Sequence, residues 1–119
     1  MYSIKVESTF SSAHKLRGYK GKCEELHGHN WKVEVALIKD KLDRAGMVLD
    51  FKFLKAKLNK ILDRLDHKYL NNIPYFKKVN PTSENIAKYI YDSIKLKFPS
   101  VNSVTVWESE NSQATYYGG

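Results

Sequence analysis

Two segments of the chain alternate between apolar and polar side chains, which is the pattern of a strand with one buried face. In residues 2–10 the apolar positions are Tyr2, Ile4, Val6 and Phe10, and in residues 29–38 they are Trp31, Val33, Val35 and Leu37. The segment between them contains Gly18 and Gly21, which interrupt any regular element. The pattern predicts an antiparallel hairpin with a long loop, and connections longer than about 12 residues are often functional.

Two later segments place apolar residues at the spacing of a helix. The first starts after Asp50, a residue suited to the N-cap, and ends near Asp66 and His67. The second starts after Thr82, which is also suited to an N-cap. We expect residues 69–81 to form a loop between the two helices.

The remaining apolar runs predict further strands: a short one at residues 47–49, a long one from residue 101 to about 109, and a last one at residues 114–117. Because the two helices follow one another in sequence, we expect them to pack side by side on one face of an antiparallel sheet, an α+β arrangement. The chain of 119 residues contains no linker-like or repeated segment, so we expect a single domain over residues 1–119.

The chain carries 20 Lys and Arg against 13 Asp and Glu, and the resulting net charge of +7 favours anionic partners. The basic residues are scattered between apolar positions, as on a solvated surface, and no signature of a nucleic-acid-binding fold accompanies them, so we expect no nucleic-acid partner. The sequence has neither an apolar run of membrane length nor a signal peptide, and its single cysteine cannot form an internal disulfide. Together these features predict a cytoplasmic protein without membrane association.

Three of the four histidines lie where the first two strands would meet. Residues two apart on a strand point to the same side, so His27 and His29 project together, and His14 has the parity of Phe10 and comes near them if the strands pair. Three neutral histidines without a fourth protein ligand are typical of an open, catalytic zinc site. A lone His-x-His is also common without a metal, so the pattern by itself leaves both interpretations open.

Three further features each have a functional and a structural interpretation. Cys23 lies in a loop rich in Lys and Gly, where an accessible thiol is expected, although a lone cysteine is often an inert buried one. Asp66 and His67 can act on a thiol, but a histidine at a helix C-terminus is favoured by the helix dipole alone. Glu108 has the parity of the apolar positions of its strand, so it requires a partner, either a ligand or a structural salt bridge.

The motifs S-S-A-H, C-E-E-L-H-G-H-N, L-D-H, N-P-T-S-E-N and V-W-E-S occur in this order. Together they resemble the 6-pyruvoyltetrahydropterin synthase and 6-carboxytetrahydropterin synthase family, over nearly the whole chain. The resemblance implies the T-fold, in which two helices are layered on a four-stranded antiparallel sheet. It also implies a homohexamer, in which three subunits join their sheets into a barrel and two such trimers stack.

The resemblance further implies a role for each matching residue. The family's zinc ligands (Zn2+) fall on three histidines of this chain: His14, His27 and His29. Its general base falls on Cys23, its Asp-His pair on Asp66 and His67, and its pterin anchor on Glu108. The residues that match the pocket-lining start of the family's second helix are Thr82 and Ser83. The implied activity is that of a lyase acting on a pterin triphosphate, 7,8-dihydroneopterin triphosphate.

Residues 15–22 carry four cations directly before Cys23. A triphosphate leaving group requires positive charge at the mouth of a site, and a flexible solvated loop would have the same composition. The sequence leaves both interpretations open.

The spacing between Cys23 and the H-G-H motif separates the branches of the family. The gap here is three residues, which resembles the 6-carboxy branch of queuosine-type deazapurine synthesis. That branch forms 6-carboxy-5,6,7,8-tetrahydropterin and releases acetaldehyde and triphosphate. Glu24 matches the place at which a glutamate replaces the cysteine in a branch that releases a 6-hydroxymethylpterin, so this product and the 6-pyruvoyl product remain alternatives.

A non-enzymatic T-fold module that binds nucleic acid or purine-like ligands is the alternative of another class. Such a module would have no need of the complete set of candidate site residues, which are His14, Cys23, His27, His29, His67 and Glu108.

Overall fold

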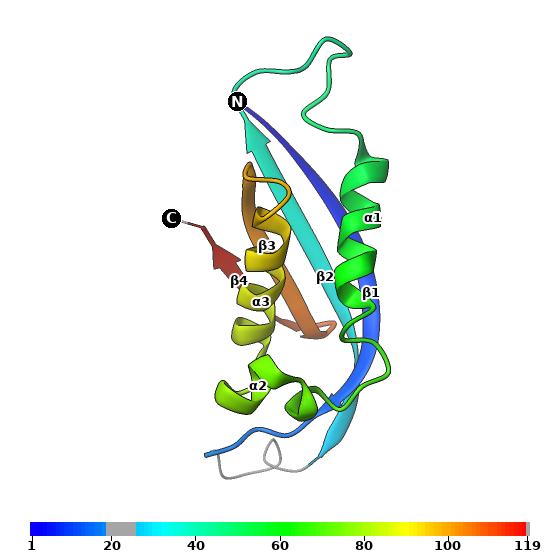
Figure 1. The fold of residues 1–119 in the computed structure, drawn as a ribbon, viewed down its shortest axis with the longest axis vertical. Helices are drawn as coiled ribbons and strands as arrows, with labels where there is room; N and C mark the ends of the chain where they lie inside the picture. The colour runs from blue at the N-terminus through cyan, green and yellow to red at the C-terminus, as the bar shows by residue number, and fades with distance from the viewer. Residues whose placement is uncertain (19–25, 119) are drawn as a thin grey trace.

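The computed structural model describes residues 1–18 and 26–118, and within them the strands form one antiparallel sheet (Figure 1). The four strands lie in the order in which they occur along the chain: β1 (Tyr2–His14), β2 (His27–Lys39), β3 (Val101–Ser109) and β4 (Ser112–Tyr117). β1 and β2 pair over their whole length, with Tyr2 opposite Lys39 and His14 opposite His27. The predicted hairpin is therefore longer than the alternation indicated, because both strands extend to the histidines.

Two helices, α1 (Phe51–Leu62) and α3 (Ser83–Lys95), cover the same face of this sheet (Figure 1). Both begin at the predicted N-caps: an Asp50 side-chain oxygen accepts a hydrogen bond from the backbone N–H of Lys52 at 2.8 Å, and the Thr82 hydroxyl accepts one from that of Asn85 at 3.1 Å. Each cap satisfies one of the free N–H groups at a helix start. The α+β prediction, with two helices on one face of a four-stranded antiparallel sheet, is confirmed.

The connecting segments differ from the prediction. Residues 69–81 are not a plain loop, because they contain a 3-10 turn, η2 (Leu70–Asn72), and a short helix, α2 (Pro74–Lys78). Proline suits the first turn of a helix, where its missing N–H is not required. α1 ends at Leu62, before Asp66 and His67.

The apolar run 47–49 forms no strand, and this part of the prediction is wrong. The backbone N–H of Asp43 donates to the Met47 carbonyl at 2.9 Å, and the Asp43 carboxylate accepts from the Met47 N–H at 3.0 Å. These bonds close a tight turn, so Met47 cannot offer the same groups to a neighbouring strand.

The hydrophobic core lies between the helices and the sheet. Trp31 and Val33 of β2, Leu58 of α1 and Ile90 of α3 are fully buried there. The opposite face of the sheet carries polar side chains such as Lys32, whose ammonium group lies 4.1 Å from the centre of the Trp107 ring. Among the described residues, no helix is long and apolar enough to cross a membrane.

Candidate metal centre

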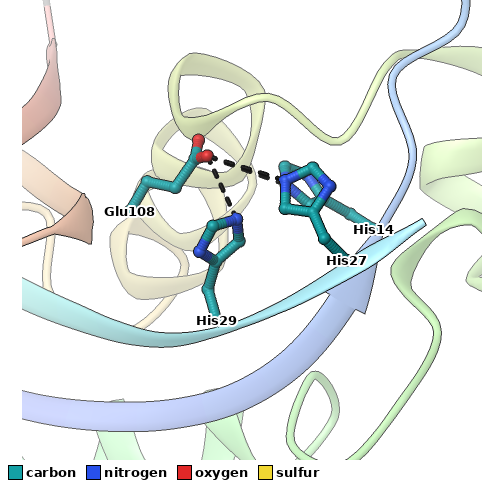
Figure 2. Close-up of side chains that lie close together, drawn as sticks. All are labelled: His14, His27, His29 and Glu108. Atoms are coloured by element: carbon teal, nitrogen blue, oxygen red, sulfur yellow. Dashed lines mark hydrogen bonds and ion pairs between the residues drawn. The ribbon is translucent and has the colours of Figure 1, made fainter. Parts of the chain in front are cut away.

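Three histidines converge at the end of the sheet where β1 meets β2 (Figure 2). His14 and His27 are direct cross-strand partners, and His29 lies two residues further along β2 on the same side. The Nε2 atoms of His14 and His27 are 3.1 Å apart. Strand parity and the pairing of the two strands predicted that these three side chains lie close together, and the structure confirms that they do.

Glu108 of β3 adds a carboxylate to this group (Figure 2). Its Oε1 atom lies 3.1 Å from Nε2 of His29, 3.9 Å from that of His27 and 4.0 Å from that of His14. One ligand atom from each of the four residues lies within 4.8 Å of the other three. The sequence predicted three histidines without a fourth protein donor, and the structure differs because β3 lies directly beside β2 and directs Glu108 at them.

Burial keeps two of the imidazoles neutral near pH 7. Desolvation lowers the pKa of His14 and that of His29 below the usual value, although the negative charge of Glu108 acts in the opposite direction on both. A neutral imidazole retains a lone pair on one ring nitrogen, and metal binding requires that lone pair.

The tautomer of His14 is set by a backbone acceptor. Its Nδ1 lies 2.7 Å from the carbonyl oxygen of Pro81, and since a carbonyl can only accept, Nδ1 carries the proton. In the neutral ring, Nε2 then directs its lone pair at the cluster, which is the arrangement that second-sphere acceptors impose on metal-binding histidines. This contact cannot be predicted from the sequence, because a backbone carbonyl has no sequence signature.

The four donors fit a divalent cation. Nε2 of His29 is buried, and its 3.1 Å contact with Glu108 Oε1 is not a hydrogen bond, so it has no hydrogen-bond partner among the described residues. Such an atom is costly unless something else occupies its lone pair. Donors about 2.0–2.2 Å from a tetrahedral ion lie roughly 3.3–3.6 Å from each other. The 3.1–4.0 Å separations between Glu108 Oε1 and the three Nε2 atoms bracket this range.

Ser83, at the start of α3, lies beside Glu108, and Thr82 is the N-cap of the same helix. The Ser83 hydroxyl is 3.5 Å from Oε2 of Glu108, the oxygen that faces away from the histidines. The Thr82 hydroxyl caps the helix and so has a local structural role.

Asp66 and His67 form a close pair elsewhere, against the outer edge of β1. His67 Nδ1 lies 2.9 Å from the Asp66 carboxylate, which also accepts a hydrogen bond from the N–H of Ser11 at 2.8 Å. These contacts, that from Ser11 foremost, lower the pKa of Asp66. The His67 side chain is 82% exposed and is not a member of the metal-binding group.

Two predicted residues, Cys23 and Glu24, lie outside the described part of the chain, as do Lys20 and Lys22 of the basic segment. Arg17, its described arginine, is not a free cation: its guanidinium donates to the carbonyls of Phe76 at 2.5 Å and Val79 at 2.9 Å. Arg17 is therefore held by the backbone of another segment and matches neither the free cation nor the flexible, solvated loop that the sequence left open.

The fold and this cluster define a T-fold protein with a group of three histidines and one glutamate that can hold a metal ion. The family model described as 6-pyruvoyl tetrahydropterin synthase matches residues 3–119, and the chain belongs to this family of lyase-type enzymes.

Relatives with different product names are similar to the chain. The 6-carboxy-5,6,7,8-tetrahydropterin synthase of Synechocystis is 38% identical, over 98% of this chain and 94% of that protein. The structure of Caenorhabditis elegans 6-pyruvoyl tetrahydropterin synthase superposes with a TM-score of 0.89 at 30% identity and covers 99% of this chain and 96% of its own. A Plasmodium vivax 6-pyruvoyltetrahydropterin synthase variant, in which a catalytic glutamate is replaced by cysteine, superposes with a TM-score of 0.72 at 27% identity and covers 98% of this chain and 97% of its own.

Proposed function

We propose that this enzyme is a zinc-dependent 6-carboxytetrahydropterin synthase, which converts 7,8-dihydroneopterin triphosphate to 6-carboxy-5,6,7,8-tetrahydropterin, acetaldehyde and triphosphate. The observation that carries the proposal is the convergence of three histidine nitrogens beside the Glu108 carboxylate. The three-residue gap between Cys23 and His27, together with the similarity to the Synechocystis enzyme, supports the 6-carboxy product. The enzyme would then be cytoplasmic and act in queuosine-type deazapurine synthesis.

The residues that would hold the zinc are His14, His27 and His29. Imidazole nitrogen is a ligand that suits zinc better than harder cations such as magnesium or calcium. When bound, zinc supplies a Lewis acid that polarises the hydroxyls of the substrate's side chain. Desolvation favours the neutral form of His14 and of His29, which is the form that binds a metal ion.

Glu108 is the proposed anchor of the pterin ring. A carboxylate can accept one hydrogen bond from the exocyclic amine of a pterin and a second from its ring N–H, and such charge-assisted pairs are about twice as strong as neutral ones. Ser83, 3.5 Å from Glu108, and Thr82 at the start of the same helix are the proposed pocket-lining residues.

Cys23 is the proposed base that removes a carbon-bound proton from the substrate. Its pKa as a free thiol would be about 8.5, so a partner must take the thiol proton near neutral pH. His67 is the proposed partner, and Asp66 would hold its imidazole in place through the 2.9 Å contact. The role of Cys23 rests on the family resemblance and on its position four residues before His27.

The exposure of His67 supports an active site that is completed between subunits. The histidine cluster lies on the helix-covered side of the sheet, whereas His67 lies at the outer edge of β1 with 82% of its side chain exposed. In the proposed hexamer the sheets join edge to edge, and His67 of one subunit would reach the site of its neighbour. Edge joining would also cover strand edges that otherwise remain open to association.

Glu24 gives a second candidate product. The similar Plasmodium vivax protein has a catalytic glutamate, and Glu24 matches the place that the resemblance gives to such a base. If Glu24 rather than Cys23 removes the proton, the expected product is a 6-hydroxymethylpterin.

The product decides between these candidates. Incubation of the purified enzyme with 7,8-dihydroneopterin triphosphate, followed by mass spectrometry of the pterin and the released fragment, should yield the 6-carboxy pterin with acetaldehyde. A 6-pyruvoyl pterin without acetaldehyde, or a 6-hydroxymethylpterin, would overturn the proposed product and leave the family assignment unchanged.

A further inference from the structure

Glu108 is directed at the histidine nitrogens and not away from them (Figure 2). Its Oε1 lies within 4.0 Å of all three Nε2 atoms, and its Oε2 lies 3.5 Å from the Ser83 hydroxyl. A glutamate that served only to anchor a pterin would gain nothing from this orientation. The position of Oε1 therefore requires its own explanation.

The contacts around Oε1 indicate what that explanation is. Nε2 of His29 is buried and makes no hydrogen bond among the described residues, although Oε1 lies 3.1 Å from it. Nδ1 of His14 donates to the Pro81 carbonyl, so the lone pair of the neutral ring is on Nε2 and faces Oε1. Electron pairs that face each other at these distances repel unless a cation lies between them.

The carboxylate is also largely removed from water, with 30% of its side chain exposed. The hydroxyl contact of Oε2 at 3.5 Å is weak compensation for a charge in that position, and Oε1 faces only the histidine nitrogens. A bond from Oε1 to a metal would satisfy it, and Ser83 would then hold the second oxygen in place.

We propose that Glu108 is a fourth protein ligand to the metal while no pterin is bound, and that it leaves the metal to accept hydrogen bonds from the pterin ring. This inference rests on the proposed function, because it assigns two successive partners to the residue proposed there as the pterin anchor. The exchange conserves charge: the carboxylate gives up one bond to the cation and gains two N–H donors. Four protein ligands give a closed, structural type of coordination, whereas three leave a position open. The site therefore opens only when its ligand is present.

Spectroscopy of the Co2+-substituted protein tests this directly, because the visible d–d bands of Co2+ depend on its ligands. The test compares wild type with Glu108→Gln, which keeps the size of the side chain and removes its charge. Glu110→Gln is the matched control: it removes the same charge from an exposed position at the β3–β4 turn. The ligand probe is unsubstituted pterin, which has the ring donors but no side chain to react.

The expected results are specific to Glu108. Its substitution should raise the dissociation constant for Co2+, measured against a competing chelator, on the order of 100-fold, since even outer-shell partners of metal ligands are worth 10–100-fold. The Co2+ spectrum of Glu108→Gln should differ from wild type without pterin, and pterin should change only the wild-type and Glu110→Gln spectra.

Equal Co2+ affinities and identical spectra for wild type and Glu108→Gln would overturn the ligand assignment. A wild-type spectrum that does not respond to saturating pterin would overturn the exchange. Both readouts are independent of turnover, so either failure is distinguishable from failure of the proposed function, which appears as absence of the pterin product from zinc-loaded wild type.

Discussion

The histidines of the cluster are held in different ways, and this decides what each substitution does. His14 is fully buried and bonded to the Pro81 carbonyl, so its replacement would disturb the core as well as metal binding. The His27 side chain is 29% exposed at the first position of β2, where a smaller side chain leaves the sheet pairing intact.

We therefore expect His27→Ala to lose metal and activity while its fold survives. Metal analysis should give about one zinc per chain for wild type and much less for the variant, because the loss of one imidazole donor weakens zinc binding whether or not Glu108 is bound to the ion. Circular dichroism should be unchanged. A fully active, metal-free His27→Ala protein would contradict the assignment of His27 as a metal ligand that activity requires.

The proposed base gives a second prediction at this scale. Cys23→Ala should lower the turnover rate on the order of 10²–10⁴, which is the usual worth of a positioned base, and should retain zinc. Glu24→Gln should alter the product ratio or have little effect, because an ordinary Glu with a pKa of about 4.3 is a weak base near pH 7. The reverse pattern, with Glu24→Gln inactive and Cys23→Ala active, would move the enzyme to the hydroxymethylpterin branch.

Acidification should destabilise the metal-free protein. Burial lowers the pKa of His14 and His29 below the value of 6.5 expected in the unfolded chain. As the pH falls, the two histidines are therefore protonated in the unfolded state before they are protonated in the folded state. Their contribution to the free energy of unfolding is fully present above about pH 6.5 and is lost as the pH falls toward the folded-state pKa values. Urea unfolding of the wild type should give a lower free energy of unfolding at about pH 5.5 than at pH 7.5. The difference between the two pH values should be smaller for His29→Gln. Equal losses for both proteins would show that His29 does not contribute.

At the scale of elements, residues 80–82 connect β1, the histidine cluster and α3. The Asn80 side chain donates to the Arg17 carbonyl at 2.6 Å and accepts from the Arg17 N–H at 2.9 Å, which continues strand-like pairing beyond β1. Its own carbonyl accepts a hydrogen bond from the Asn85 side chain at 2.9 Å, and the next carbonyl, that of Pro81, orients His14.

Asn80→Ala should therefore lower the free energy of unfolding by about 1–3 kcal/mol, the sum of two hydrogen bonds of roughly 0.5–1.5 kcal/mol each. It should also weaken zinc binding, because the Pro81 carbonyl would be held less firmly. Asn72→Ala, at an exposed position of η2, is the matched control and should change stability by less than about 0.5 kcal/mol. If the two variants are equally stable, the bridging role of Asn80 is wrong.

The strands and the two long helices are the features that the sequence pattern predicts best. Alternation predicted the paired strands and helical spacing predicted α1 and α3, because each period matches one buried face. β1 extends to His14 although Ser11, Ser12 and Ala13 show no alternation of apolar and polar character, and there the prediction depended only on the parity of His14 with Phe10. Strand parity brought the three histidines together. The approach of Glu108 depends on the pairing of β2 with β3, a long-range contact that has no local sequence signal.

At the scale of the whole molecule, the proposed active site requires residues from neighbouring subunits. We expect light scattering to report a hexamer in solution. A stable, active monomer would contradict the proposal.

Mixing inactive variants tests sharing of the site more directly. His27→Ala and His67→Ala homo-oligomers should each be inactive, yet unfolding and refolding them together should restore activity. If each site takes its cluster from one subunit and His67 from another, about one quarter of the sites in a random mixture are intact. No recovery in verified mixed oligomers would mean that both residues serve the site of the same chain.

The central claim is that a metal held by the histidine cluster makes this chain a pterin synthase. The most direct measurement is product analysis by mass spectrometry, with 7,8-dihydroneopterin triphosphate, for protein stripped of metal by a chelator and for the same protein reloaded with zinc. We predict no product from the stripped protein and 6-carboxy-5,6,7,8-tetrahydropterin with acetaldehyde after one equivalent of zinc per chain is restored. Equal turnover by the stripped and reloaded protein, or no pterin product from either, would contradict the account.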